Sequence, residues 1–200
     1  MIGGPGIFIS VRVCEMVPLH GNIRMSHDPV IEHTALSSLS TYVLLDVRAP
    51  DVFDAGHPAQ SVRVPIEMWE GAAKAGETSF ENVAYWEYQI ARLGLDGQLP
   101  AVIYDDGRMT EAARVWFILQ YFGAKAFILN GGWPAIEGGG PLTGSPSKPG
   151  ASTTFRAHPG SGPVGLVDRT TLKTELNADI RVFDARTADE YAGMDLRRNA

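Results

Sequence analysis

Two adjacent carboxylates, Asp105 and Asp106, directly follow the apolar run AVIY and precede a helical pattern that starts at Thr110. In a parallel sheet, anionic groups collect where a strand ends beside a helix N-terminus, because unpaired N–H groups and the helix dipole favour negative charge there. An aspartyl nucleophile of a phosphatase could stand here, but Gly107 follows Asp106 and the DxDx(T/V) spacing is absent. The residues therefore favour a structural role, in which the carboxylates themselves occupy the positive end of the helix.

The chain contains a single thiol, that of Cys14. One cysteine can form neither an internal disulfide nor a four-cysteine zinc site, and it gives no sign of an oxidising compartment. Cys14 follows the apolar run ISVRV, and the charge of Arg12 would favour its thiolate. Pro18 and Gly21, however, leave no helix N-terminus to stabilise that anion. Cys14 is either a catalytic thiol or an incidental residue of a terminal extension, and the sequence favours the second.

Neither a metal motif nor a cofactor motif is present in the sequence. The five histidines are His20, His27, His33, His57 and His158. They show no metal-ligand spacing such as HxxxH, and the chain has neither a P-loop nor a GxGxxG fingerprint. The sequence therefore predicts no metal and no cofactor.

The charge balance argues against nucleic acid as a partner. The chain carries 17 Lys and Arg against 23 Asp and Glu, and no basic run is longer than the pair Arg197 and Arg198. Apolar stretches such as residues 115–119 fall far below the roughly 18 residues of a membrane span. Arg12 interrupts the N-terminal apolar run, which does not resemble a secretory signal. We expect a cytoplasmic protein with neither a nucleic-acid nor a membrane partner.

Short apolar runs alternate with helical patterns along the middle of the chain. The runs expected to form buried parallel strands are residues 42–47, 61–66, 101–104 and 126–129. One helix is predicted over residues 80–93 with Ser79 as N-cap, and another over residues 110–122 with Thr110 as N-cap. The alternation predicts an α/β fold, in which a central parallel sheet is flanked by helices.

The composition divides the chain into segments. Residues 1–24 are predicted to lie outside the fold, because Met25 opens a polar start that runs directly into periodic sequence. Between Gly138 and Gly165 lie 8 of the 22 glycines and 5 of the 13 prolines, which is typical of a linker. We therefore expect a domain at residues 25–143, a Gly/Pro-rich linker at 144–164 and a further segment at 165–200.

That last segment repeats part of the first domain. The sequence DVRAPDVFDAG from Asp46 aligns without gaps on DARTADEYAGM from Asp184, at an offset of 138 residues. Such a repeat indicates two copies of one fold. The second copy has only 14 residues after Arg186, against about 95 residues after Arg48 in the first, so we expect it to be a truncated start.

Four motifs stand out along the first domain: LLDVR at residues 44–48, GHPAQS at 56–61, YDDG leading into AARVW at 104–116 and LNGGW at 129–133. Together they resemble the first half of tandem rhodanese-type sulfurtransferases, the thiosulfate and 3-mercaptopyruvate sulfurtransferases. The GHPAQS turn departs from the family by lacking one residue between His57 and Pro58, which affects local geometry. The resemblance runs from Ala35 to about Leu142 and continues through the linker into the second repeat. It implies a rhodanese-like three-layer domain followed by an incomplete second copy.

The resemblance also implies a division of labour between the two domains. The second domain carries a cysteine that takes sulfane sulfur from a small anionic donor and passes it, as a persulfide, to cyanide or another thiol. Asp105 stands at the matching position of the first domain and cannot carry sulfur, so this domain should be non-catalytic. Arg186 matches a donor-binding arginine of the family, and Arg197 or Arg198 a further one. Arg186 could equally form a structural ion pair with a nearby carboxylate, as Arg48 could.

We therefore expect a member of the sulfurtransferase family that is inactive on its own, because its 200 residues lack the cysteine loop of the second domain. A chain supplying that second domain is a possible complementing partner. The alternative is a non-enzymatic module that binds an anion or a partner protein.

Overall fold

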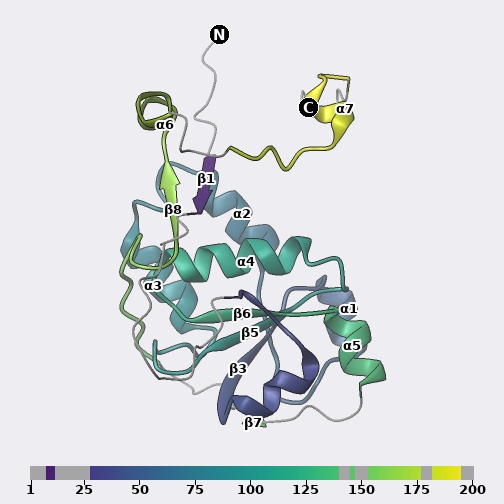
Figure 1. Ribbon diagram of the computed structural model, residues 1–200. Helices are drawn as coiled ribbons and strands as arrows, with labels where there is room; N and C mark the ends of the chain where they lie inside the picture. Colours follow the sequence, from purple (N-terminus) through teal and green to yellow (C-terminus); the bar gives the residue numbers. More distant parts are fainter. Residues whose placement is uncertain (1–7, 12–27, 140–144, 147–152, 177–181, 195–200) are drawn as a thin grey trace, which may run out of the picture. The chain divides into compact units, whose positions relative to one another are not determined.

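The computed structural model describes residues 8–11, 28–139, 145–146, 153–176 and 182–194 (Figure 1). The chain divides into two compact units, of which the larger comprises residues 9–165 and the smaller residues 1–8 and 166–200. Within the described residues, none of the helices combines the length and the apolar character that crossing a membrane requires.

A parallel sheet forms the centre of the larger unit, with the strand order β2-β6-β5-β3-β4 and with β7 beside the start of β3. Its strands are β2 (Val30–Ile31), β3 (Thr41–Asp46), β4 (Val62–Arg63), β5 (Ala101–Tyr104), β6 (Ala126–Leu129) and β7 (Ser145–Pro146). The strand pairs of this sheet are parallel, so the carboxyl ends of the strands lie at one edge of the sheet. Predicted strands 101–104 and 126–129 are confirmed to the residue.

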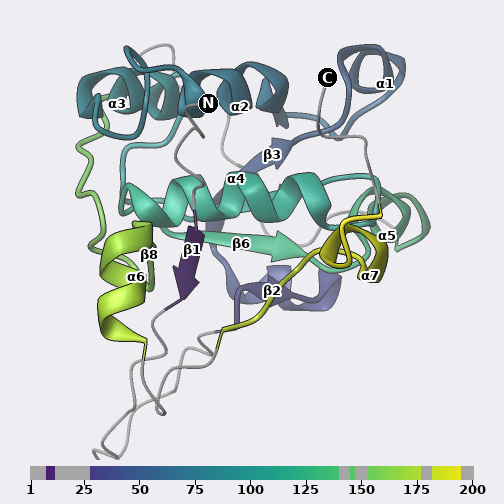
Figure 2. The ribbon, with the colours of Figure 1, turned by 90° about the horizontal axis from the view of Figure 1, so that it is seen from above.

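Helices cover both faces of this sheet. One face packs against α2 (Ile66–Lys74), α3 (Val83–Ala91) and α4 (Thr110–Tyr121), and the other against η1 (His33–Ser38) and α5 (Gly132–Gly138). Helix α4 lies along β6, as Figures 1 and 2 both show, while α1 (Pro50–Ala55) follows β3. Alternate side chains of β3 enter the two cores: Val43 and Leu45 on one side, Tyr42 and Leu44 on the other. The three-layer α/β prediction is confirmed.

The strand predicted at residues 61–66 is wrong in extent. Only Val62 and Arg63 pair with β3, and Ile66 already begins helix α2. Pro65 precedes that helix and has no N–H to donate to a strand ladder, so the chain leaves the sheet here. The strand predicted at residues 42–47 forms one residue earlier, as β3.

The predicted helix start at residue 110 is confirmed, whereas the start at residue 80 and both predicted N-caps are wrong. Helix α3 begins at Val83 rather than residue 80, because the side chain of Asn82 accepts the N–H of Tyr85 at 3.1 Å and caps the helix. In α4, Thr110 is the first helical residue, and the N-cap is Met109, which makes no side-chain capping bond.

The smaller unit contains the last two residues of β8 (Val164–Val167), followed by α6 (Arg169–Glu175) and α7 (Ala188–Tyr191). Strand β1 (Phe8–Val11) pairs with β8 in a separate two-stranded sheet. Most of residues 1–24 lie outside the described residues, and their predicted place outside the fold stays a prediction.

Candidate functional site

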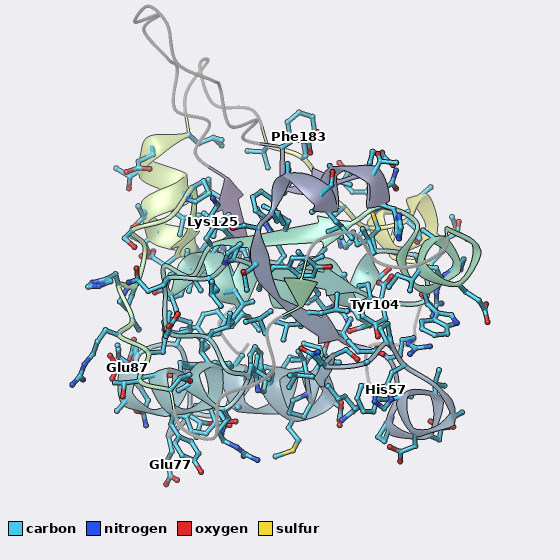
Figure 3. All side chains as sticks on the ribbon, turned by 90° about the horizontal axis from the view of Figure 1, so that it is seen from below. His57, Glu77, Glu87, Tyr104, Lys125 and Phe183 are labelled. Atoms are coloured by element: carbon cyan, nitrogen blue, oxygen red, sulfur yellow. The ribbon has the colours of Figure 1, made fainter. Side chains whose placement is uncertain are left out.

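The site is built at the edge of the sheet where β3, β5 and β6 end. Asp46 closes β3 and stands in register with Tyr104, which closes β5. The next residue, Asp105, opens the loop that leads into α4. Tyr104 and His57 lie at this end of the sheet, and Lys125, which precedes β6, lies at the opposite end (Figure 3).

The carboxylate of Asp105 lies inside a ring of backbone N–H groups. Its Oδ1 accepts the N–H of Gly107 at 2.9 Å and of Met109 at 3.1 Å, and its Oδ2 accepts the N–H of Ala112 at 3.3 Å. Asp105 is only 3% exposed. Because Ala112 belongs to the first turn of α4, the carboxylate takes up a helix donor that a capping side chain would otherwise bind. The predicted structural role is confirmed for this residue.

Two residues with positive φ turn these N–H groups inward. Gly107 has φ 99° and Met109 has φ 60°, a backbone region that residues other than glycine rarely occupy. The carboxylate of Asp105 bonds the N–H of both residues, and these bonds offset the strain at Met109. The loop thus closes tightly around its own anion.

Asp106 does not share that role. Its side chain is half exposed and forms a 2.6 Å ion pair with Arg108, which is largely exposed as well. The hydrogen bond from Arg108 lowers the pKa of Asp106. The expectation that both carboxylates occupy the helix end is therefore wrong for Asp106, because the turn after Asp105 directs the second carboxylate toward solvent.

The loop after β6 packs directly on the Asp105 loop. The N–H of Trp133 donates to the carbonyl oxygen of Asp105 at 2.7 Å. A Cβ on Gly132 would lie 2.6 Å from that oxygen and 2.6 Å from the nitrogen of Gly107, so only glycine fits here. The YDDG and LNGGW motifs thus lie in two loops that pack against each other.

A buried ion pair between Arg48 and Asp46 contacts Tyr104 and Trp133, which flank the two loops. Asp46 accepts the Arg48 guanidinium at 2.6 Å and the Tyr104 hydroxyl at 2.5 Å, and both members of the ion pair are buried. Arg48 also donates to the carbonyl of Gly56 at 2.8 Å, and its guanidinium lies 4.1 Å from the centre of a Trp133 ring. Burial and the hydrogen bond to Asp46 raise the pKa of Tyr104 above its ordinary value, so the hydroxyl keeps its proton.

Arg186 repeats the geometry of Arg48 in the smaller unit. Its Nε lies 2.9 and 3.0 Å from the two carboxylate oxygens of Asp184, and its terminal nitrogen lies 2.6 Å from Oδ2. The matching distances from Arg48 to Asp46 are 3.0, 3.1 and 2.6 Å. The ion pair considered for Arg186 is thus formed, although it is partly exposed.

The structure does not place the remaining predicted site residues. Cys14, Arg197 and Arg198 lie outside the described residues. His57 stacks on Phe53, with ring centres 3.8 Å apart, and its Nδ1 lies 2.7 Å from the carbonyl oxygen of Phe53. No group of three or more His, Cys, Asp or Glu suited to a metal ion occurs among the residues that the structure describes.

Sequence reasoning missed the contributions of Tyr104, Met109 and Trp133. A signal existed for the first, because Tyr104 and Asp46 both end neighbouring parallel strands and therefore had to meet. The place of the Trp133 ring and the positive φ of Met109 depend on how the loops after β5 and β6 pack together. No local sequence pattern predicts that packing.

These contacts define what the site can do. Its N–H groups could stabilise an anion at the mouth of a strand–helix loop, but the carboxylate of Asp105 already takes them up. Asp105 is bound by these three backbone donors. The loop therefore holds a carboxylate at the point where its N–H groups converge.

Comparisons with known proteins place the fold. The family model of the rhodanese-like domain matches residues 32–138. A 3-mercaptopyruvate sulfurtransferase from Leishmania major is 22% identical, with a TM-score of 0.53 over 84% of this chain and 49% of that one. A 3-mercaptopyruvate sulfotransferase from Escherichia coli is 20% identical, with a TM-score of 0.46 over 67% of this chain and 56% of that one. The chain spans about half the length of these structures. No curated protein sequence matches it significantly.

Proposed function

The chain belongs to the family of rhodanese-like domains, and on this premise we propose that its larger unit is a non-catalytic member of that family. The protein to which it contributes would transfer sulfane sulfur from a small anionic donor to a thiophilic acceptor, such as cyanide or a thiol. Thiosulfate and 3-mercaptopyruvate are the proposed donors. The name of the Leishmania major protein supports the second of them.

The hydrogen bonding of Asp105 carries this proposal. Sulfur transfer needs a soft thiolate that attacks the sulfane sulfur and holds it as a persulfide, and backbone N–H groups stabilise that anion. In this chain the N–H groups of Gly107, Met109 and Ala112 bind a carboxylate instead. A carboxylate oxygen is a hard, weak nucleophile that cannot hold sulfane sulfur, so the domain would serve as a wall of the active-site cleft.

Arg186 is the proposed donor-binding residue of the second repeat, together with Arg197 and Arg198. Arg186 is partly exposed and keeps its guanidinium beside Asp184, so donor binding would require an anion to compete with that carboxylate. This proposal rests on the repeat and on the family resemblance.

A thiosulfate:cyanide assay with persulfide detection tests the proposed inactivity. The 200-residue chain should give no turnover above the uncatalysed rate, and the Cys14→Ala variant should give the same result. Turnover by the chain would contradict the proposal. Its loss in Cys14→Ala would then identify Cys14 as the sulfur carrier.

A matched pair of cysteine variants tests the position assigned to Asp105. In a Cys14→Ala background, the thiol of Asp105→Cys would face the N–H groups of Gly107 and Met109, whereas that of Asp106→Cys would face solvent. We expect the thiol pKa of Asp105→Cys to lie below that of Asp106→Cys, because backbone N–H groups stabilise its thiolate, and the pH dependence of thiolate ultraviolet absorbance measures the difference. Thiosulfate should transfer its sulfane sulfur to the first variant alone, which becomes a persulfide as sulfite is released. Equal thiol pKa values and no persulfide on either variant would contradict the assignment.

A second candidate function is binding of a partner protein, which the exposed side chains of the second repeat favour. Phe183 is 85% exposed, and Val182 is also exposed. At the offset of 138 residues they correspond to Leu45 and Leu44, which are fully buried in β3 between neighbouring strands. The proposed partner is therefore a polypeptide that supplies the rest of a second rhodanese-like domain, including its cysteine loop.

The same assay separates the two candidates. A separately produced polypeptide with a rhodanese-type cysteine loop should restore sulfur transfer when it is added to this chain, and Phe183→Asp should weaken that effect. Stable binding without turnover would favour a non-enzymatic module. Absence of both binding and turnover would contradict complementation.

A further inference from the structure

Residues 153–164 belong to the Gly/Pro-rich segment of the chain, yet they bind the end of α4. The N–H of His158 donates to the carbonyl oxygen of Phe122 at 2.9 Å, and the N–H of Gly160 donates to that of Tyr121 at 2.8 Å. The last carbonyls of a helix have no partner within the helix. Residues 153–164 therefore complete the hydrogen bonding of α4.

The same segment closes the end of α3. The Thr153 hydroxyl donates to the carbonyl oxygen of Ala91 at 2.7 Å, and the N–H of Ala157 donates to the Glu87 carboxylate at 3.0 Å. Arg156 adds an ion pair with Glu87 at 3.6 Å. Glu87 lies on α3 at the end of the molecule remote from Tyr104 (Figure 3). The contacts with α3 and α4 are thus far from the Asp105 loop.

Apolar side chains fix the segment in the main core. Phe155 is 3% exposed, and both Phe155 and Val164 belong to the cluster that includes Trp86 and Phe122. The backbone also approaches closely at Gly162, where a Cβ would collide with the carbonyl oxygen of Gln120. Each of these contacts would be lost if the segment moved as a free linker.

We propose that residues 153–164 form a strap that belongs to the cooperative folding unit of the larger domain, whose boundary therefore lies at Val164 rather than at residue 143. The strap closes two helix ends and buries an aromatic side chain in the core. A linker opens locally and independently of the domain, whereas a strap of this kind opens only when the domain unfolds.

Native-state hydrogen exchange on the full chain tests this proposal. The amides of His158 and Gly160 should exchange with the same free energy as those of Ile118 and Leu119 in α4. Increasing sub-denaturing urea should accelerate all four with the same slope, because one global opening exposes them. Exchange of the His158 and Gly160 amides that is faster and independent of urea would overturn the proposal.

A variant pair provides the second test. Phe155→Leu should accelerate exchange in the strap and in α4 by the same factor, because it weakens the single unit that both share. Phe183→Leu changes a side chain that is 85% exposed and should leave both unchanged. Acceleration confined to His158 and Gly160 in Phe155→Leu would identify a linker. Phe155→Leu is preferred to Phe155→Ala because it retains most of the buried side chain.

Discussion

At the scale of single residues, Asp105 serves as the anion of its own loop. A free loop of this shape would present converging N–H groups to solvent or to a ligand, whereas here the side chain of the first loop residue accepts them. The strained Met109 and the first turn of α4 both depend on that carboxylate. The loop is therefore organised before any ligand arrives.

The Asp105→Asn variant should show this dependence. It keeps the shape of the side chain but replaces one acceptor oxygen with an NH2 group that faces N–H donors. We expect a loss of about 1.5–3 kcal/mol in the free energy of unfolding, the range for hydrogen bonds to a charged group. Urea denaturation measures this loss.

Asp106→Asn is the matched control for that measurement. Asp106 is half exposed and pairs only with the largely exposed Arg108, so the change should be within about 0.5 kcal/mol. Equal effects of the two substitutions would show that the N–H groups around Asp105 contribute nothing to stability.

The sequence was sufficient to place Asp105 at a helix end but insufficient to separate it from Asp106. The strand run and the helical pattern located the loop, and both carboxylates were equivalent at that level. Their separation accompanies the positive φ of Gly107 and Met109, and the backbone of Gly107 packs closely against Gly132. Such close contacts between distant loops have no local sequence signal.

At the scale of elements, the loops after β5 and β6 contact each other through the backbone at Gly132. Gly132 has φ 54° and touches the backbone of Asp105 and Gly107, so each loop supports the conformation of the other. The Trp133 ring then covers Arg48, which follows β3. The ends of three strands are thereby connected.

Gly132→Ala should disrupt this junction. Alanine would have to adopt the left-handed backbone conformation of Gly132, and its Cβ would collide with Asp105 and Gly107. The hydrogen bond from the Trp133 N–H to the Asp105 carbonyl would then break. We expect a loss of at least about 2 kcal/mol in the free energy of unfolding. Thermal and urea unfolding of the variant provide the measurement.

Gly138→Ala supplies the comparison within the same helix. Space is open around Gly138, and alanine favours a helix, so stability should stay equal or rise by up to about 1 kcal/mol. A Gly132→Ala variant as stable as Gly138→Ala would mean that the two loops separate at little cost.

Elements with several buried residues were predicted well, and short elements were not. The runs AVIY and AFIL gave β5 and β6 to the residue, because each apolar run is bounded by proline or polar residues, Pro100 and Asp105 for the first and Lys125 and Asn130 for the second. Strand β2 has two residues, and its pairing with β6 comes from tertiary structure. Helix α2 was hidden because the apolar run across Pro65 resembled one continuous strand.

At the scale of the whole molecule, the sequence repeat is also a repeat of local structure. Arg48 and Arg186 bind their aspartates through the same atoms at nearly the same distances, and a short helix follows each pair, α1 or α7. The surroundings differ, since Arg48 is buried beneath Trp133 whereas Arg186 is partly exposed. One motif thus occurs in two environments within a single chain.

This pair allows the effect of burial to be measured at constant local geometry. Arg48→Ala leaves Asp46 buried without its cation and should cost about 3–5 kcal/mol in the free energy of unfolding. Arg186→Ala should cost no more than about 1 kcal/mol, because water can replace the guanidinium at Asp184. If Arg48→Ala does not fold, Arg48→Lys serves as the milder variant.

A larger loss in the free energy of unfolding for Arg186→Ala than for Arg48→Ala would contradict this expectation, because it would mean that the ion pair of Arg186 is the more buried of the two.

The repeat itself could be predicted from sequence alone, because eleven residues align without a gap. The different burial of its two copies could not, since it depends on the strands that surround each one.

The carboxylate at the head of the α4 loop also determines how this loop responds to oxidants. A thiolate in that place can be oxidised through sulfenic to sulfinic acid, and the later steps are irreversible. A carboxylate undergoes none of these reactions and does not react with mild alkylating agents. The side chain at position 105 should therefore keep one chemical state under peroxide stress that would inactivate a cysteine at the same position.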